Sequence, residues 1–242
     1  MFRTINILSW NIQGILGQID DKKVSKINEI PNHIISKHNI IFLQETHLDD
    51  NKSDDIHLDG FYNKHYIRKR RGKARKDSGG LSIFIKEDIR EHFKIIPNNN
   101  SDIVWLVTNS IDKKQTYIGS VYIPPSNSSY GKDHRDTIWE NLLMDIENYS
   151  NSGNIILCGD FNSRTAMLLD YVNYDDIDKI QDHSYLNPNL TNFEVKRRLS
   201  MDKVATSNGR KLIESCIDND LIILNGRTLG DFQGKYTYRT DR

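Results

Sequence analysis

A short apolar run that ends in an acid and an amide constrains the fold of this chain more than any other feature. The run Ile155–Cys158 leads, after one glycine, into Asp160 and Asn162. An apolar run of this length bounded by glycine predicts a fully buried strand. The two polar side chains then lie just past the strand end, on the same side of an extended backbone, where α/β proteins gather ligands. A plain strand-end turn is the alternative, because Asp, Asn and Gly are common turn formers.

The same kind of run recurs along the chain and predicts further buried strands. These strands are expected at Ile5–Asn11, Ile40–Leu43, Gly60–Tyr66, Leu81–Ile85, Phe93–Ile96, Ile103–Thr108, Thr116–Ile123, Leu221–Leu224 and from Lys235 onward. Their apolar density favours strands that are covered on both faces.

Apolar residues at helical spacing predict helices between the strands. Val24–Ile35, which Pro31 interrupts, indicates one kinked helix or two short ones, and Ile138–Tyr149 indicates another. Leu212–Ile217 indicates a helix capped near Ser207 or Asn208, whereas Met167–Val204 has no clean period and predicts long surface loops. We therefore expect one α/β domain over residues 1–242, without a linker or an internal repeat.

Composition excludes several classes of protein. No apolar run approaches the roughly 18 residues of a membrane-spanning helix, and the N-terminus has no signal-peptide core. The two cysteines, Cys158 and Cys216, form neither a disulfide framework nor a zinc site, which fits a soluble protein of a reducing, intracellular compartment. Trp10, Trp105 and Trp139 each lie within an apolar pattern and are predicted to pack in the core.

Basic residues are concentrated in one segment, although the chain as a whole balances 33 basic against 33 acidic residues. Seven of ten residues between Ile67 and Lys76 are basic: Arg68, Lys69, Arg70, Arg71, Lys73, Arg75 and Lys76. Such a segment is either a solvated or nuclear-import-like loop, or a contact to nucleic-acid phosphates that weakens with salt.

Polar side chains that follow different strands supply the parts of a phosphodiester-cleaving site. Glu45 is a hard oxygen ligand suited to Mg²⁺, and Asp160 can position or deprotonate a water molecule. Asn11 and Asn162 can donate to a phosphate, and Tyr122 can donate to the charge that develops on it.

Five segments carry a resemblance to a known family. They occur in the order Trp10–Gly14, Leu43–His47, Gly79–Ile83, Val121–Pro125 and Gly159–Asn162. They resemble the successive motifs of the endonuclease/exonuclease/phosphatase superfamily, which has the DNase I-like fold. This resemblance implies a four-layer α/β sandwich, with two face-to-face β-sheets flanked by helices.

Three segments sharpen the resemblance: Gln44–His47, Tyr122–Pro125 and Leu224–Thr228 are most similar to the endonuclease domain of LINE-type (non-LTR) retrotransposons. That family implies a Mg²⁺-dependent enzyme, with Mn²⁺ as a substitute, that nicks target DNA in the nucleus. A reverse transcriptase region of the same element is then an expected partner.

The resemblance also implies roles for single residues. Glu45 would hold the metal with Asn11 beside it, and Tyr122 would contact the scissile phosphate. Asp160 would orient the attacking water, and Asn162 would bind the phosphate or help to fix that water. Thr237 matches a position that contacts DNA.

The family pattern continues beyond this chain with an Ile-Asp-Tyr strand and a Ser-Asp-His segment. We therefore expect a domain that is incomplete at its C-terminus and lacks its last strands. Asp182-His183 and Asp133-His134 are the pairs that could stand in for that histidine, but both fall in the wrong chain order. A remnant that at most binds nucleic acid, an abasic-site repair or RNA-directed nuclease, and a phosphatase remain alternatives.

Overall fold

The computed structural model describes residues 4–19, 22–29, 32–51, 53–69, 78–97, 100–109, 114–172 and 197–237. It contains two compact units, Met1–Phe161 and Asn162–Arg242, each of which is described by itself.

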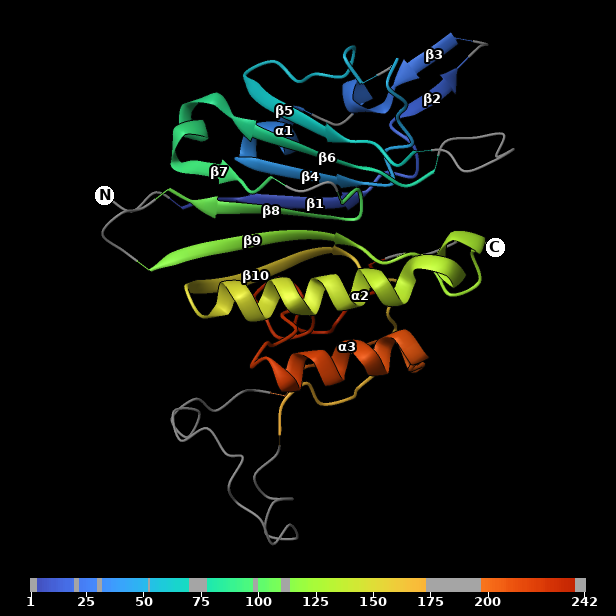
Figure 1. Cartoon of the computed structure of the whole chain (residues 1–242), viewed down its shortest axis with the longest axis vertical. Coiled ribbons are helices and arrows are strands. Elements are labelled where there is room, and N and C mark those ends of the chain that lie inside the picture. Colours follow the sequence, from blue (N-terminus) through green and yellow to red (C-terminus); the bar gives the residue numbers. More distant parts are fainter. Residues whose placement is uncertain are drawn as a thin grey trace, which may run out of the picture. The chain divides into compact units, whose positions relative to one another are not determined.

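Two four-stranded sheets form the first unit (Figure 1). The first sheet has the order β1-β4-β6-β5, and the second has the order β10-β9-β8-β7. In each sheet one edge pair is parallel, β1 with β4 and β10 with β9, and the other pairs are antiparallel. The strand bounds are β1 Ile7–Asn11, β4 Ile40–Gln44, β5 Phe61–Tyr66, β6 Leu81–Lys86, β7 Phe93–Ile95, β8 Ile103–Thr108, β9 Gln115–Tyr122 and β10 Gly153–Asp160.

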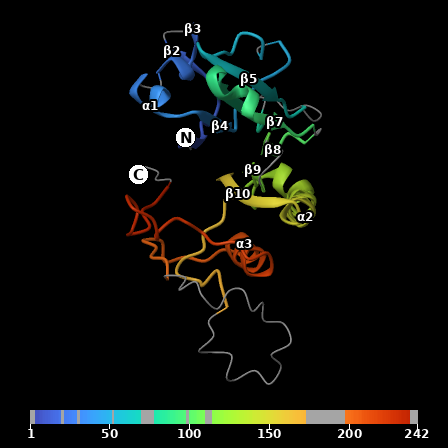
Figure 2. The same ribbon diagram turned by 90° about the vertical axis from the view of Figure 1, so that its left-hand side faces the viewer.

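Helices and a hairpin lie outside the sheets. The hairpin pairs β2 (Leu16–Ile19) with β3 (Lys22–Ser25). Short helical segments are η1 (Lys26–Glu29), α1 (Asn32–Lys37) and η2 (Glu87–His92), and α2 is a long helix, Ser129–Ser150. Figure 2 shows α1 and the hairpin on the side of the first sheet that faces away from α2. None of the described helices is both long and apolar enough to cross a lipid bilayer.

Alternation along β4 builds two cores. Ile40 and Phe42 face the second sheet and join the core between the sheets, which also contains Val104 and Ile118. Ile41 and the other alternate residues of β4 pack on the opposite face, against the apolar side of α1. The sandwich interior and the outer face of the first sheet are therefore both filled.

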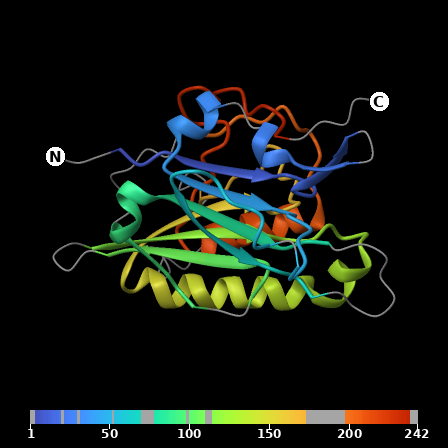
Figure 3. The same cartoon turned by 90° about the horizontal axis from the view of Figure 1, so that it is seen from above.

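The outer face of the second sheet is covered by α2, which runs along its strands (Figure 3). The helix begins after Ser128, whose hydroxyl accepts a hydrogen bond from the Gly131 N–H at 2.9 Å. Trp105 on β8 donates its indole N–H to Asp145 at 2.8 Å and packs edge-on against Tyr149. Helix, sheet, sheet and helix make four layers, which confirms the predicted α/β sandwich.

A buried amide joins the two sheets. Gln44 at the end of β4 is fully buried, and its Nε2 donates to Ser9 Oγ at 3.1 Å and to Ser120 Oγ at 3.0 Å. Ser9 lies on β1 of the first sheet and Ser120 on β9 of the second. The sandwich is therefore held by polar contacts as well as by apolar packing.

Three predictions of local structure in this unit were wrong. Ile155–Cys158 lies in a strand, β10, but the strand is not fully buried: it is the last strand of its sheet, and Ile156 is exposed. Trp10 is 44% exposed, because β1 is an edge strand with a neighbour on one side only, whereas Trp105 and Trp139 are buried as predicted. Val24 belongs to β3 rather than to a helix, and the predicted helical pattern is divided between η1 and α1. Pro31 lies outside the described residues.

The second unit contains α3 (Ser207–Asp218), whose N-cap is Thr206 rather than the predicted Ser207 or Asn208; the Thr206 hydroxyl accepts from the Gly209 N–H at 3.1 Å. Leu221–Leu224 is not a strand, because no neighbouring segment pairs with it among the described residues. No strand begins at Lys235 within the described part of this unit either. Most of the predicted loop region, residues 173–196, lies outside the described residues.

Charged pairs hold the loops of the second unit. The Arg227 guanidinium makes two hydrogen bonds of 2.6 Å to the carboxylate of Asp170, which also accepts from the Ile223 N–H at 2.6 Å. Burial acts to raise the pKa of Asp170, but these bonds outweigh it and the pKa is lowered. Arg164 makes a similar two-bond pair with Asp202 at 2.7 Å.

Candidate active site

Parallel pairing brings four of the predicted site residues to one end of the first unit. Asn11 ends β1 beside Gln44, so Glu45 follows directly on the neighbouring strand. Asp160 ends β10 directly beside Tyr122, the last residue of β9. Each sheet therefore contributes one pair of adjacent strand ends to the same edge of the sandwich.

Asn11 links the two sheets through its side chain. Its Oδ1 accepts a hydrogen bond from the Gln13 N–H at 3.1 Å, which directs the Nδ2 group toward Asp160. The Nδ2 group donates to Asp160 Oδ2 at 2.8 Å. One carboxylate oxygen of Asp160 thus accepts from an amide whose own orientation is fixed. This bond fixes the orientation of the Asp160 carboxylate.

Glu45 lies in a loop with unusual backbone conformations. The φ angles of Glu45 and His47 in this loop are 53° and 54°, and that of Gln13, in the segment after β1, is 50°; all three are in the left-handed region that non-glycine residues rarely adopt. Backbone hydrogen bonds hold this loop: the Gly14 N–H donates to the Glu45 carbonyl at 2.6 Å, and the His47 N–H donates to the Gly79 carbonyl at 2.9 Å. Strained residues that the surrounding structure over-determines cluster at functional sites, which supports this loop as part of one.

Tyr122 connects the two strand-end pairs. It is buried, and its hydroxyl donates a hydrogen bond to Glu45. Burial raises the pKa of Tyr122, the bond to Glu45 and the charges of Glu45 and Asp160 raise it further, and Arg68 opposes them. The phenol therefore stays protonated at neutral pH and can act as a donor.

The oxygen donors of this site fit a hard divalent cation. Glu45 offers a partly exposed carboxylate and Asn11 an amide oxygen, and Mg²⁺ is held in proteins by one or two carboxylates while it keeps several waters. Within the described ranges, no group of three or more histidine, cysteine or acidic side chains could hold a metal ion. Glu45 and Asn11 would therefore hold a largely hydrated ion.

Arg68 does not fit the role predicted for it. The side chain is buried rather than solvated, and its guanidinium is paired with the carboxylate of Asp102. A guanidinium paired in this way cannot serve as a surface contact to a phosphate backbone. Lys69 is exposed, whereas Arg70, Arg71, Lys73, Arg75 and Lys76 lie outside the described residues.

Sequence reasoning missed the partner of Arg68. Asp102 precedes β8 and is buried, and Tyr130 donates its hydroxyl to Asp102 Oδ2 at 2.8 Å. One signal was present in the sequence: Tyr62, Tyr66 and Arg68 are separated by even numbers, as are residues that share one face of an extended strand.

The remaining predicted residues belong to the second unit or to helix α2 of the first, or lie outside the described residues. Asn162, with a φ of 45°, and Thr237 belong to the second unit, and their roles stay predictions. His134 lies in the early turns of α2 with its ring 4.6 Å from that of Tyr130, and the pair Asp182-His183 lies outside the described residues.

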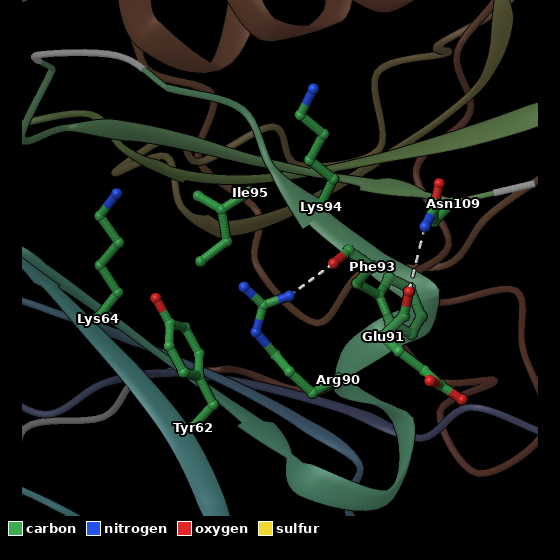
Figure 4. Close-up of a pocket in the computed structure, with 8 residues that line it drawn as sticks. All are labelled: Tyr62, Lys64, Arg90, Glu91, Phe93, Lys94, Ile95 and Asn109. Carbon is green, nitrogen blue, oxygen red and sulfur yellow. Dashed lines mark hydrogen bonds between the residues drawn. The ribbon is translucent and has the colours of Figure 1, made fainter.

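A pocket of about 400 Å³ lies away from these strand ends, between the edge strands β5 and β7 (Figure 4). Arg90 lies at its centre and donates to the Phe93 carbonyl at 2.7 Å, while Lys64 and Lys94 extend on either side. It contains none of the predicted site residues, so this pocket is separate from the candidate active site.

Comparison with known proteins places the chain in a family. The profile of the Endonuclease/Exonuclease/phosphatase family matches residues 8–199. Similar solved structures include AP endonuclease LMAP from Leishmania major, with 17% identity, a TM-score of 0.49 and coverage of 66% of this chain and 56% of that one. The 3′ phosphatase NExo from Neisseria, bound to a product DNA hairpin, has 16% identity, a TM-score of 0.45 and coverage of 67% and 60%. The catalytic domain of APE2 from Xenopus laevis has 17% identity, a TM-score of 0.47 and coverage of 69% and 61%.

The chain thus spans about 56–61% of the length of these structures. No curated protein matches the chain. The family profile covers well over half of the sequence and includes every strand of both sheets except the first residue of β1. This chain therefore belongs to the endonuclease/exonuclease/phosphatase family, whose enzymes generally depend on a divalent metal.

Proposed function

We propose that the chain is a Mg²⁺-dependent endonuclease domain that cleaves one strand of DNA. One observation carries the proposal: Asn11 orients Asp160 while Tyr122 donates to Glu45, at adjoining ends of two sheets. An oriented carboxylate, a protonated phenol and a metal-binding carboxylate are the groups that phosphodiester hydrolysis requires.

Each residue has a distinct task in the proposed reaction. Asp160 accepts a hydrogen bond from the attacking water and takes its proton as the oxygen bonds to phosphorus. When substrate binds, the single O–H of Tyr122 turns from Glu45 to a non-bridging phosphate oxygen, whose negative charge grows in the transition state. The bond from phosphorus to the 3′ oxygen breaks as the new bond forms, and the leaving 3′ oxygen takes a proton from solvent water, which leaves a 3′-hydroxyl and a 5′-phosphate. A cation held by Glu45 and Asn11 supplies further charge stabilisation at the phosphate when it is bound.

Supercoiled plasmid tests the proposal directly. We expect nicking with Mg²⁺ and a loss on the order of 10²–10³ in kcat for Asp160→Asn and for Glu45→Gln, as for other preorganised charged groups. Exposed acids provide matched controls: Asp59→Asn and Glu91→Gln make the same chemical changes away from the strand ends and should keep full activity. Equal nicking by all of these variants would contradict the assignment.

The finer proposal is that the domain belongs to a LINE-type retrotransposon and nicks nuclear target DNA to prime reverse transcription. It is supported by the resemblance of Gln44–His47, Tyr122–Pro125 and Leu224–Thr228 to that group. Comparing intact duplex, abasic duplex, RNA and a small phosphoester as substrates tests it. Preference for abasic DNA would instead indicate a repair nuclease, and turnover of the small phosphoester alone would indicate a phosphatase.

A further inference from the structure

Arg68 is a buried cation at the same end of the sandwich as the candidate active site. It follows β5 of the first sheet, and its counter-ion, Asp102, precedes β8 of the second. Asp102 is itself fixed, since its carboxylate accepts from the Tyr130 hydroxyl at 2.8 Å and its backbone N–H donates to Asn100. A charge this deep in the protein requires a held partner, and Asp102 provides one.

The same aspartate also contacts the backbone of Tyr122. The carbonyl of Asp102 accepts a hydrogen bond from the Tyr122 N–H at 2.8 Å. Asp102 therefore fixes the guanidinium of Arg68 through its side chain and the main chain of Tyr122 through its carbonyl. The relative position of these two residues depends on one aspartate.

Aromatic rings and a glycine fix the guanidinium itself. Arg68 Cζ lies 3.9 Å from the centre of the Tyr130 ring and 5.2 Å from the centre of the Tyr122 ring. A Cβ atom at Gly79 would lie 2.0 Å from Arg68 Cζ, so only glycine leaves room for the guanidinium there. Arg68 Nε is buried without a hydrogen-bond partner among the described residues. An unpaired buried donor of this kind lowers stability.

Arg68 also affects the charge environment of the Tyr122 hydroxyl. Glu45 and Asp160 both act on the Tyr122 hydroxyl with negative charge, and Arg68 is the cation that opposes them. Because the guanidinium contacts the ring rather than the hydroxyl, it leaves the hydroxyl available to Glu45.

We propose that Arg68 is the positioning residue of Tyr122: paired with Asp102 and stacked at the ring, it holds the Tyr122 hydroxyl toward Glu45. The catalytic consequence rests on the proposed function, whereas the positioning itself does not. Arg68 would thus act in the reaction through Tyr122, without touching the substrate.

Tyrosine-selective isotope labelling and NMR of the metal-free protein test the positioning. Two variants probe it: Arg68→Lys keeps the charge but loses the planar stack, and the double variant Arg68→Met with Asp102→Asn removes both charges, so that no unpaired charge remains buried. We expect the Tyr122 ring resonances to shift or broaden in both, while the Tyr62 resonances stay in place. Arg90→Met is the matched control, because Arg90 stacks on Tyr62 at 4.3 Å and should shift Tyr62 alone. Unchanged Tyr122 resonances in the folded double variant would overturn the proposal.

Steady-state nicking kinetics supply the second readout. A misplaced Tyr122 should lower kcat by about 10²-fold with a much smaller change in KM, because a misplacement of about 1 Å can cost this much in rate. Arg68→Lys, which keeps the charge, should lose less kcat than the double variant. If the variants show the NMR response but the wild-type protein never nicks DNA, the proposed function is contradicted and the positioning is left intact. Active protein whose kcat and Tyr122 resonances ignore Arg68 contradicts the positioning alone.

Discussion

Arg68 and Arg90 both place a guanidinium against a tyrosine ring, yet the two arginines lie in opposite surroundings. Arg68 is buried between the sheets and bonded to a carboxylate. Arg90 is half-buried at the edge pocket, where it contacts Tyr62 and donates to the Phe93 carbonyl at 2.7 Å (Figure 4). The stacking contact is common to both sites, so the difference between them comes from the counter-charge and from burial.

Arg68 therefore contributes to the stability of the fold, whereas Arg90 lies at the edge of a sheet and contributes less to it. Water can solvate the charge of Arg90, so a neutral acceptor is sufficient for it. Arg68 has little access to water, and removing either member of its ion pair leaves a charge that nothing compensates. Cations such as Lys64 also deter unwanted pairing at an edge strand, which is a sufficient reason for the basic character of the Figure 4 pocket.

The largest effect is expected when one member of the buried pair is removed. Arg68→Met or Asp102→Asn should lower the free energy of unfolding by about 3–5 kcal/mol, because each leaves an uncompensated buried charge. Urea unfolding followed by circular dichroism measures the change. A loss near zero for both would show that water reaches the pair and that the contrast with Arg90 is only apparent.

Removing both members should restore much of that loss. The double variant Arg68→Met with Asp102→Asn should unfold within about 1–2 kcal/mol of the wild type, since replacing a whole buried ion pair is often close to neutral. The four proteins make a double-mutant cycle measured in the same urea titrations. Additive losses would mean that the two side chains do not depend on each other.

A pair of glycines tests the packing around Arg68. Gly79→Ala and Gly60→Ala both place a methyl group on a backbone with positive φ, at 71° and 76°. Gly60 has open space around it, so its substitution should cost only about 1 kcal/mol from backbone strain. Gly79→Ala also collides with the guanidinium and should cost about 1–3 kcal/mol more. Equal losses of stability in thermal melts would contradict the close approach.

The smallest effect is expected at the edge. Arg90→Met should change the unfolding free energy by no more than about 1 kcal/mol, the value of an exposed cation–π contact. The same urea titrations detect it, with Lys94→Met as a neighbouring control, because Lys94 stacks on no ring among the described residues. A loss as large as that of Arg68→Met would mean that the counter-charge is not what distinguishes the two sites.

Sequence alone predicted the contacts that follow from strand pairing and missed those that depend on distant partners. The proximity of Asn11 to Gln44 and of Asp160 to Tyr122 was accessible, because each pair ends two neighbouring parallel strands and such strands end together. The ion pair of Arg68 was not, because its partner lies 34 residues away and only the even spacing of Arg68 from Tyr66 distinguishes it from Lys69.

Edge effects explain the other differences. Trp10 has the local pattern of a core residue, but periodicity does not reveal that β1 is the last strand of its sheet. Leu221–Leu224 has the composition of a strand but lacks a neighbour to pair with in the described part of its unit. Both cases show that a strand is defined by its partners as much as by its own residues.

The amide of Gln44 gives the sandwich resistance to shear. Because Gln44 bonds to a hydroxyl on each sheet, one sheet cannot slide over the other without breaking a buried contact. In hydrogen–deuterium exchange, the central strands β4 and β9 should consequently lose protection together, in one opening event, rather than sheet by sheet. The two sheets, of which the first positions Glu45 and the second carries Tyr122, would then stay aligned with each other in every smaller fluctuation of the protein.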